Sequence, residues 1–397
     1  MRDFFDSNLL LEGESAQRIY QEIRDLPIID YHCHLNEKEI AEDKQYESIG
    51  ELWLAGDHYK WRAMRLCGVE ERLITGNASY HDKFLAYAAI MPKLIGNPLY
   101  YWTHLELQQI FGISLPLNRD TAEEIWKRAN EVLQGLSVRS LLKQFKVEFI
   151  ATTDDPESPL SYHGTVDGIR LTPTFRPDRC LAEGMDKKAL EKRLDFFVEK
   201  GCRIADHGFD NVGEDTSDLE WLMEACADRG LLLQLHFGTF RNINSQAFSA
   251  IGRDAGFDVF RGTVNTDGIA CVLDRMSGKG KLPATVLYTL NDAYARPLAA
   301  ISGGFRNVYM GAAWWFNDTV EGIRRQLDTV AEYAALGTNL GMLTDSRSFS
   351  SYVRFDFFRR ILASYIGRKV DLGEYDGAAA ATLAKDISYY NVKEILS

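Results

Sequence analysis

The sequence lacks the features of membrane-spanning and repetitive proteins. No apolar run in it approaches the roughly 20 residues that a transmembrane helix needs. Residues 1–10 include acidic side chains and no long apolar segment, so we expect no secretory signal peptide. Low-complexity segments and short-period repeats are also absent. We therefore expect a globular protein that does not bind membranes.

Cysteine is scarce and scattered. The 397 residues contain six cysteines, and no two of them form a CxxC pair. A chain that depended on disulfides would show a denser framework of cysteines. The pattern predicts reduced thiols and a cytoplasmic location.

Acidic residues outnumber basic ones. The sequence has 45 Lys and Arg against 57 Asp and Glu, a formal net charge of -12 at pH 7. Proteins that bind nucleic acid regardless of its sequence neutralise phosphates with an excess of cations, so we expect no nucleic-acid partner. An anionic small molecule is still compatible with this charge, because a few arginines inside a cleft can oppose the field of the whole protein.

Eight short apolar runs predict β-strands. From the third run onward, each is followed by a helical pattern such as DLEWLMEACADRG, and most of these patterns end in glycine. Alternating strands and helices predict parallel pairing, and eight such units favour an α/β fold, a (β/α)8 TIM-type barrel. A doubly wound open sheet is the competing architecture, but no glycine-rich phosphate loop follows the first run. The predicted strands cover residues 27–35, 147–153, 170–175, 202–207, 231–237, 284–290, 307–315 and 340–345.

One connection is far longer than an ordinary crossover. Residues 36–145 separate the first two predicted strands and carry helical patterns such as YHDKFLAYAAIMPKLIG and TAEEIWKRANEVLQGL. We predict a helical insertion domain over 36–145 that covers the mouth of the barrel and contributes substrate contacts. The barrel itself would then consist of residues 1–35 and 146–397.

The first predicted strand ends in the sequence His32-Cys33-His34. Alternate residues of a strand point to the same side, so the two imidazoles lie next to each other. Two neighbouring neutral imidazoles suit one divalent metal ion, and a pair of ordinary hydrogen-bonded histidines is the alternative.

Polar residues gather at the ends of the other predicted strands, where the chemistry of such barrels takes place. Each has a structural alternative: Asp345 as a helix cap, Arg176 as a surface ion-pair partner, Trp314 as a packing residue. Burying so many polar groups at one end of a barrel would be costly without a polar ligand. Their common location favours a binding site. The residues at these ends include Asp154, Asp155, Arg176, Asp178, Asp206, His207, His236, Arg241, Trp314, Asp345 and Arg347.

The same residues resemble a known family. The H-x-H motif on the first strand and Asp345 on the eighth are similar to the amidohydrolase superfamily of metal-dependent barrels. The longer strings IIDYHCHL, GDHYKWRAMR, PTFRPD, QLHFGTFRN, GAAWWFND and GMLTDSRSF resemble uronate (glucuronate) isomerases in particular. The likeness runs from near the N-terminus to the last helical pattern. One segment, between DHG at 206–208 and QLH at 234–236, is shorter here than in that family.

The resemblance implies an enzyme that interconverts an aldose uronate, such as D-glucuronate or D-galacturonate, with its ketose. The implied cofactor is a single divalent metal ion, Zn2+, held by His32, His34 and Asp345. Asp345 would act as the proton-transferring base instead of, or in addition to, binding the metal. Arg347 would lie near the developing oxygen charge, and Tyr59 would serve as an acid or proton relay.

The resemblance also implies residues that hold the substrate. Arg176 is the preferred clamp for the carboxylate, because a guanidinium binds a carboxylate in a bidentate fork, and Arg241 is the second candidate. His58, His207, His236 and Trp314 are further candidate substrate contacts. A homo-oligomer is expected.

Two rival functions remain at this point. One is a mononuclear metal-dependent amidohydrolase or lactonase of the same superfamily. The predicted fourth strand, residues 202–207, contains no lysine, which argues against a binuclear hydrolase with a bridging carboxylated lysine. The other rival is a sugar-acid binding protein without turnover.

Overall fold

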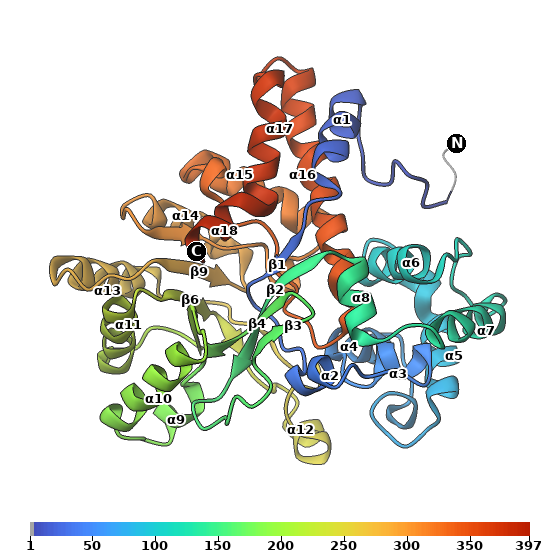
Figure 1. Cartoon of the computed structure of the whole chain (residues 1–397), viewed down its shortest axis with the longest axis horizontal. Coiled ribbons are helices and arrows are strands. Elements are labelled where there is room, and N and C mark those ends of the chain that lie inside the picture. The colour runs from blue at the N-terminus through green and yellow to red at the C-terminus, as the bar shows by residue number, and fades with distance from the viewer. Residues whose placement is uncertain (1–3) are drawn as a thin grey trace.

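The computed structural model describes residues 4–397, and its centre is a curled sheet of parallel strands (Figure 1). Each strand pairs in parallel with the next one in the order predicted from the sequence. The order is β1 (Ile28–Asp30), β2 (Val147–Asp154), β4 (Ile169–Phe175), β5 (Ile204–Phe209), β6 (Leu232–Phe237), β9 (Thr285–Thr289) and β10 (Val308–Met310). The parallel arrangement is therefore confirmed, although β1 and β10 are much shorter than the predicted strands at 27–35 and 307–315.

The predicted eighth strand is wrong as a strand, although its segment lies beside β1. Residues 339–346 form no regular strand, yet the Asp345 amide donates to the His32 carbonyl at 3.0 Å and the His34 amide donates to the carbonyl of Ser346 at 2.9 Å. Asp345 has a φ of 46° and Gly341 a φ of 73°, values that an extended strand does not accommodate. The segment thus lies next to the first strand, as a barrel requires, with an irregular backbone.

Helices cover the outside of the sheet and follow the strands along the chain (Figure 1). In α15 the buried residues Ile323, Leu327 and Val330 recur at helical spacing and form the face that packs inward. Gly230 ends α11 with a φ of 64°, the left-handed conformation in which glycine has no steric penalty. These helices are α9 (Asp178–Ala182), α10 (Lys187–Glu199), α11 (Ser217–Arg229), α13 (Thr266–Gly278), α14 (Ala295–Ser302), α15 (Val320–Tyr333) and α16 (Val353–Asp371).

All regular elements of the long connection between β1 and β2 are helices, and they lie on the right-hand side of Figure 1. Its buried side chains, among them Trp53 and Phe84, belong to the same apolar cluster as Phe357 and Ile361 of α16. One continuous apolar core therefore joins residues 36–145 to the rest of the chain. The division of the chain into two domains stays a prediction. The helices are α2 (Glu37–Ala41), α3 (Ile49–Leu54), α4 (His58–Leu66), α5 (Tyr80–Ile90), α6 (Pro98–Phe111), α7 (Ala122–Leu133) and α8 (Val138–Gln144).

Several elements were not predicted. The short strand β3 (Gly164–Val166) pairs antiparallel with β4. Between β6 and β9 the chain forms a hairpin of β7 (Thr239–Phe240) and β8 (Val259–Phe260), with α12 (Ser245–Ile251) at its tip. In Figure 1, α12 projects from the bottom of the molecule. The remaining α-helices are α1 (Glu14–Ile23), α17 (Gly377–Lys385) and α18 (Asn391–Ile395). Across residues 4–397 no helix is both long and apolar enough to cross a membrane.

Candidate active site

A cavity of about 550 Å³ opens at the carboxyl ends of the strands. The segments after β1, β4 and β10 and the irregular segment that contains Asp345 form its floor, and α4 and the hairpin between β6 and β9 form its walls. The sequence-predicted residues that line it are His32, His34, His58, Arg176, Arg241, Trp314, Asp345 and Arg347. The predicted candidates Tyr59, His207 and His236 do not line it.

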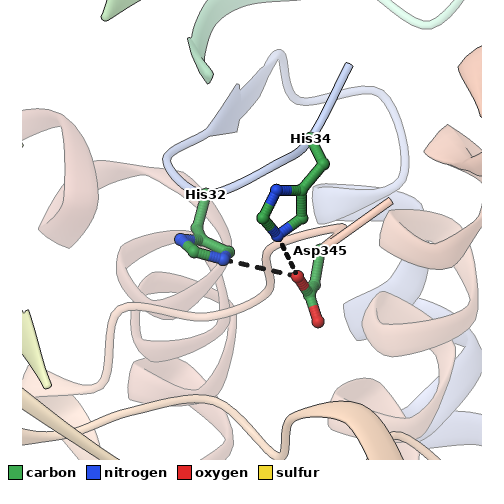
Figure 2. Close-up of side chains that lie close together, drawn as sticks. All are labelled: His32, His34 and Asp345. Atoms are coloured by element: carbon green, nitrogen blue, oxygen red, sulfur yellow. Dashed lines mark ion pairs between the residues drawn. The ribbon is translucent and has the colours of Figure 1, made fainter. Parts of the chain in front are cut away.

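Two histidines and one carboxylate point toward one another (Figure 2), and all three residues line this cavity. His32 Nε2 lies 3.3 Å and His34 Nε2 lies 3.2 Å from the same oxygen, Oδ1 of Asp345. The other oxygen of Asp345 accepts a hydrogen bond from Trp314 Nε1 at 2.5 Å. Asp345 is therefore held from two sides, and its Oδ1 faces both imidazoles.

The backbone before Asp345 is fixed by a buried carboxylate. Asp30, the last residue of β1, accepts the Thr344 amide at 2.9 Å and the Thr344 hydroxyl at 2.6 Å. Burial raises the pKa of Asp30 to about 6, although the bonds from Thr344 oppose this shift. The pairing ties the segment 340–345 to β1 and so places Asp345 opposite His32 and His34.

The charges in this group depend on one another. Burial alone would raise the pKa of Asp345, but the contacts with His32 and His34 hold that pKa well below its usual range. Burial lowers the pKa of His34 to about 4, so this imidazole is neutral near pH 7. A carboxylate and a neutral imidazole are the protonation states in which these side chains bind metal.

The three side chains can hold a metal ion. Their ligand atoms all lie within 4.8 Å of one another. Two atoms that bind one tetrahedral zinc at about 2.0–2.1 Å lie about 3.3 Å apart, and the separations from Asp345 Oδ1 are 3.2 and 3.3 Å. Among residues 4–397, no hydrogen-bond partner satisfies the buried ring nitrogens of His32. An imidazole whose buried nitrogens make no hydrogen bond, with carboxylate oxygens of Asp345 and Asp206 at 3.3 and 3.9 Å, fits a cation site, because unsatisfied buried polar atoms are costly.

Asp206 is a functional residue to which the sequence alone assigned no role. It is fully buried in the middle of β5, 3.1 Å from Arg176 Nη1 and 2.6 Å from His236 Nε2. Burial would raise its pKa, but His236, Arg176 and His32 hold it below the usual range. His32, Asp206 and His236 form a second group whose ligand atoms lie within 4.8 Å of one another. The DHG string was the available signal for this carboxylate.

His207 points away from the cavity. Neighbouring residues of a strand face opposite sides, so Asp206 and His207 cannot both point toward the site. His207 Nδ1 lies 2.6 Å from Asp178 Oδ1, and the other oxygen of Asp178 accepts from Arg176 Nε at 2.8 Å. A direct substrate contact from His207 does not follow from this geometry, and the side chain is placed to hold Asp178 against Arg176.

His236 lies below the cavity floor. Its side chain is buried, with its ring centroid 5.0 Å from that of His32 and 4.8 Å from that of Trp314. Together with its contact to Asp206, this packing places His236 behind the residues that face the cavity. It is positioned to orient Asp206 and His32.

Tyr59 lines a smaller cavity of about 130 Å³. Asp57 caps α4 by accepting the Tyr59 amide at 2.9 Å, and this fixes the first turn that carries His58 and Tyr59. The Tyr59 hydroxyl donates to Asp318 Oδ2 at 3.0 Å. Burial raises the pKa of Asp318 to about 7, and burial and the nearby Asp318 carboxylate raise the pKa of Tyr59. Asp318, in the GAAWWFND string, is a second residue to which the sequence alone assigned no role.

Arginines give the cavity a cationic lining. Arg241 Nη1 lies 2.9 Å from Asp258 Oδ2, and Arg347 Nη2 lies 3.1 Å from Asp254 Oδ2. Arg347 Nη1 also lies 3.2 Å from His58 Nδ1. A further arginine, Arg253, lines the cavity and was not predicted. The cavity therefore suits an anionic ligand despite the negative charge of the whole chain.

Comparison with known proteins identifies the family. The model of the glucuronate isomerase family matches residues 1–185 and 213–396. The chain belongs to this family. It is 40% identical to a uronate isomerase of Caldanaerobacter subterraneus subsp. tengcongensis, with 100% of both chains covered. It is 38% identical to a uronate isomerase of Oceanobacillus iheyensis, with 98% of this chain and 97% of the relative covered.

Solved structures agree with this assignment. A uronate isomerase from Thermotoga maritima superposes with a TM-score of 0.95 at 32% identity and covers 100% of both chains. A glucuronate isomerase from Caulobacter crescentus has the same fold, with a TM-score of 0.90 at 24% identity, 99% of this chain and 96% of that chain covered. The predicted fold class and family are confirmed.

The family match leaves one segment uncovered. Residues 186–212 fall outside the matched ranges and contain α10 and β5. The alignments to the two relatives extend over 464 and 459 residues, more than the 397 residues of this chain. The alignments therefore include positions to which this chain contributes no residue, and the shortened segment after DHG stays a prediction. Asp206 nevertheless lies at the site from within the unmatched segment.

Proposed function

We propose that the protein is a uronate isomerase that interconverts D-glucuronate with D-fructuronate, and D-galacturonate with D-tagaturonate. The observation that carries the proposal is the convergence of His32, His34 and Asp345 on the floor of an arginine-lined cavity, in a chain of the glucuronate isomerase family. Conversion of D-glucuronate into its ketose by the purified protein is the direct test.

The reaction moves one proton from C2 to C1 of the open-chain sugar and one between the two oxygens, with no net gain or loss of atoms. It needs a base near C2, an acid near the oxygens, and stabilisation of the enediolate charge. We assign the base to Asp345, whose pKa is held low enough for it to be ionised. Arg347 would stabilise the oxygen charge, and Tyr59, supported by Asp318, would supply or relay the proton.

We further propose that His32, His34 and Asp345 hold one Zn2+ ion. Three protein ligands with a position left for substrate are the usual set for a catalytic zinc. When bound, the ion would act as a Lewis acid on the substrate oxygens. Asp345 would then be a ligand, a base or both, and a substitution that measures both properties is discussed below.

Arg176 is the proposed clamp for the substrate carboxylate, with Arg241 as the second candidate. Arg176→Lys should raise KM for D-glucuronate about tenfold or more, because the ammonium loses the bidentate fork. Steady-state kinetics give the value. Arg179→Lys is the matched control, because Arg179 is an exposed arginine on the same segment that pairs with Asp155 and does not line the cavity. An unchanged KM for Arg176→Lys, with a raised KM for Arg241→Lys, would transfer the role to Arg241.

Tyr59→Phe should lower kcat about 100-fold while changing KM much less, because the substitution removes only a hydroxyl that donates or relays a proton. The same assay separates the two constants. Tyr46→Phe is a suitable control, since the Tyr46 hydroxyl bonds Glu39 at 2.9 Å and the residue does not line either cavity. A kcat for Tyr59→Phe within about threefold of the unsubstituted enzyme would exclude Tyr59 from proton transfer.

We also propose a cytoplasmic homo-oligomer whose partner is a small hexuronate. All six cysteines are free, which fits a reducing compartment. The hydrolase and the non-catalytic binder are disfavoured by the family match, and conversion of D-glucuronate into its ketose would exclude both.

A further inference from the structure

The hairpin between β6 and β9 returns along the cavity through residues 254–258, here named the return arm. Asp254, Gly256 and Asp258 of this arm line the cavity. The arm contains no regular helix or strand of its own. Its position therefore depends on contacts with neighbouring elements.

Two arginines of α4 hold the return arm by its backbone. Arg62 Nη1 donates to the Gly256 carbonyl at 3.1 Å and to the Asp258 carbonyl at 3.2 Å. Arg65 Nη1 donates to the Ala255 carbonyl. Carbonyls along the arm thus receive charged donors from one helix, and charged donors make the stronger hydrogen bonds.

Both arginines are themselves fixed. Glu71 accepts from Arg65 Nε and Nη2 at 2.7 Å each, in a bidentate pair that leaves Nη1 for the arm. The Arg65 guanidinium also lies 4.3 Å from the centre of the Phe257 ring, and that of Arg62 lies 5.1 Å from the Phe316 ring. Because Phe257 belongs to the arm itself, the contacts that fix the donors independently of the arm are the Glu71 pair for Arg65 and the Phe316 ring for Arg62.

Gly256 allows the arm to approach α4 closely. Its φ is +88°, and an added Cβ would lie 2.9 Å from the His58 carbonyl oxygen and 3.3 Å from Arg62 Cβ. Only glycine fits both the conformation and the space. The contact brings the arm against the first turn of α4, the turn that carries His58 and Tyr59.

The arm in turn orients two cavity arginines. Asp258, which is buried, accepts from Arg241 Nη1 at 2.9 Å and from the Asn242 amide at 2.8 Å. Asp254 Oδ2 lies 3.1 Å from Arg347 Nη2. A shift of the arm would therefore move the carboxylates that direct Arg241 and Arg347 into the cavity.

We propose that Arg62 and Arg65 are positioning residues, which fix the return arm on α4 so that Asp258 and Asp254 aim Arg241 and Arg347 at an anionic substrate. This inference rests on the proposed function for the identity of that anion. Neither arginine lines the large cavity. Arg62 lines the smaller cavity beside Tyr59, and its effect on the large cavity is exerted through the arm.

Arg62→Met removes the donors and keeps an apolar stem of similar length. We expect KM for D-glucuronate to rise about tenfold through Arg241, and kcat to fall as well, because Asp254 of the arm pairs with Arg347, the proposed stabiliser of the oxygen charge. Hydrogen exchange should quicken about tenfold at the amides of Asn242 and Ile243, which bond Asp258 and Phe257 across the hairpin. Arg62→Lys, which restores a cationic donor, should recover part of both effects.

Arg128→Met is the matched control, because Arg128 is an exposed helical arginine that pairs with Glu124 on the same helix. It should change neither KM nor exchange in the hairpin. Gly256→Ala is a second route to the same result, because its methyl group would push the arm away from His58 without removing a charge.

The outcomes are distinguishable. Unchanged exchange in both Arg62→Met and Gly256→Ala would overturn the claim that α4 holds the arm. Faster exchange with an unchanged KM would overturn the claim that the arm positions the arginines. Absence of turnover in the unsubstituted enzyme would instead contradict the proposed function, and the exchange measurement would still report on α4 and the arm.

Discussion

Asp345→Asn is expected to lower kcat for D-glucuronate by about 1000-fold or more, because the amide can neither accept a proton from C2 nor offer a charged oxygen to a cation. The fold should persist, since the oxygen of the new carboxamide can still accept from Trp314 Nε1, as the carboxylate does. Steady-state kinetics and metal content should be measured on the same preparation. A full metal complement with lost activity would assign Asp345 to proton transfer, and loss of both would assign it to metal binding.

The control for this substitution is Asp274→Asn. Asp274 is exposed on α13 and does not line the cavity, so its neutral variant should retain full activity and metal content. An Asp345→Asn enzyme with activity close to that of this control would remove Asp345 from the mechanism.

Arg354→Met is expected to destabilise the protein by about 3–5 kcal/mol, the typical result of leaving buried charges without their partner. Arg354 is 1% exposed and donates to the Thr344 carbonyl at 2.7 Å. Its guanidinium lies 4.0 Å from the centre of the Trp102 ring and 4.9 Å from that of Tyr59. Its charge also lowers the pKa values of the buried acids Asp30, Asp57, Glu106 and Asp318.

Urea unfolding followed by tryptophan fluorescence measures this change in the free energy of unfolding. Arg128→Met is again the control, and removal of its exposed ion pair should cost less than about 1 kcal/mol. If the free energy of unfolding of Arg354→Met also differed from that of the unsubstituted protein by less than about 1 kcal/mol, the buried acids would not need Arg354 for stability.

The sequence predicts the central strands well because each is a short apolar run followed by a helical pattern. The runs at 147–153 and 231–237 differ from β2 and β6 by one residue at an end. The run at 340–345 failed because apolar composition reports burial but not backbone conformation. Here the bonds from Thr344 to Asp30 and the left-handed φ of Asp345 replace a regular ladder.

The group of His32, His34 and Asp345 could be predicted from the H-x-H spacing and from the resemblance to the amidohydrolase superfamily, although all three residues lie outside regular strands. The site could not be predicted where the question was which of two neighbouring residues faces the cavity. In the string DHG, strand alternation directs Asp206 inward and His207 outward, and the sequence alone does not fix which side faces the cavity. Contacts between distant segments, such as Tyr59 with Asp318 or Arg62 with the return arm, leave no periodic signal.

The most direct test of the account is the conversion of D-glucuronate by the purified, zinc-loaded protein, followed by NMR in deuterated water. We predict accumulation of D-fructuronate to an equilibrium mixture, with solvent deuterium entering the carbon skeleton as the proton moves between C2 and C1. Binding of D-glucuronate without any ketose, or no reaction with either D-glucuronate or D-galacturonate, would contradict the account.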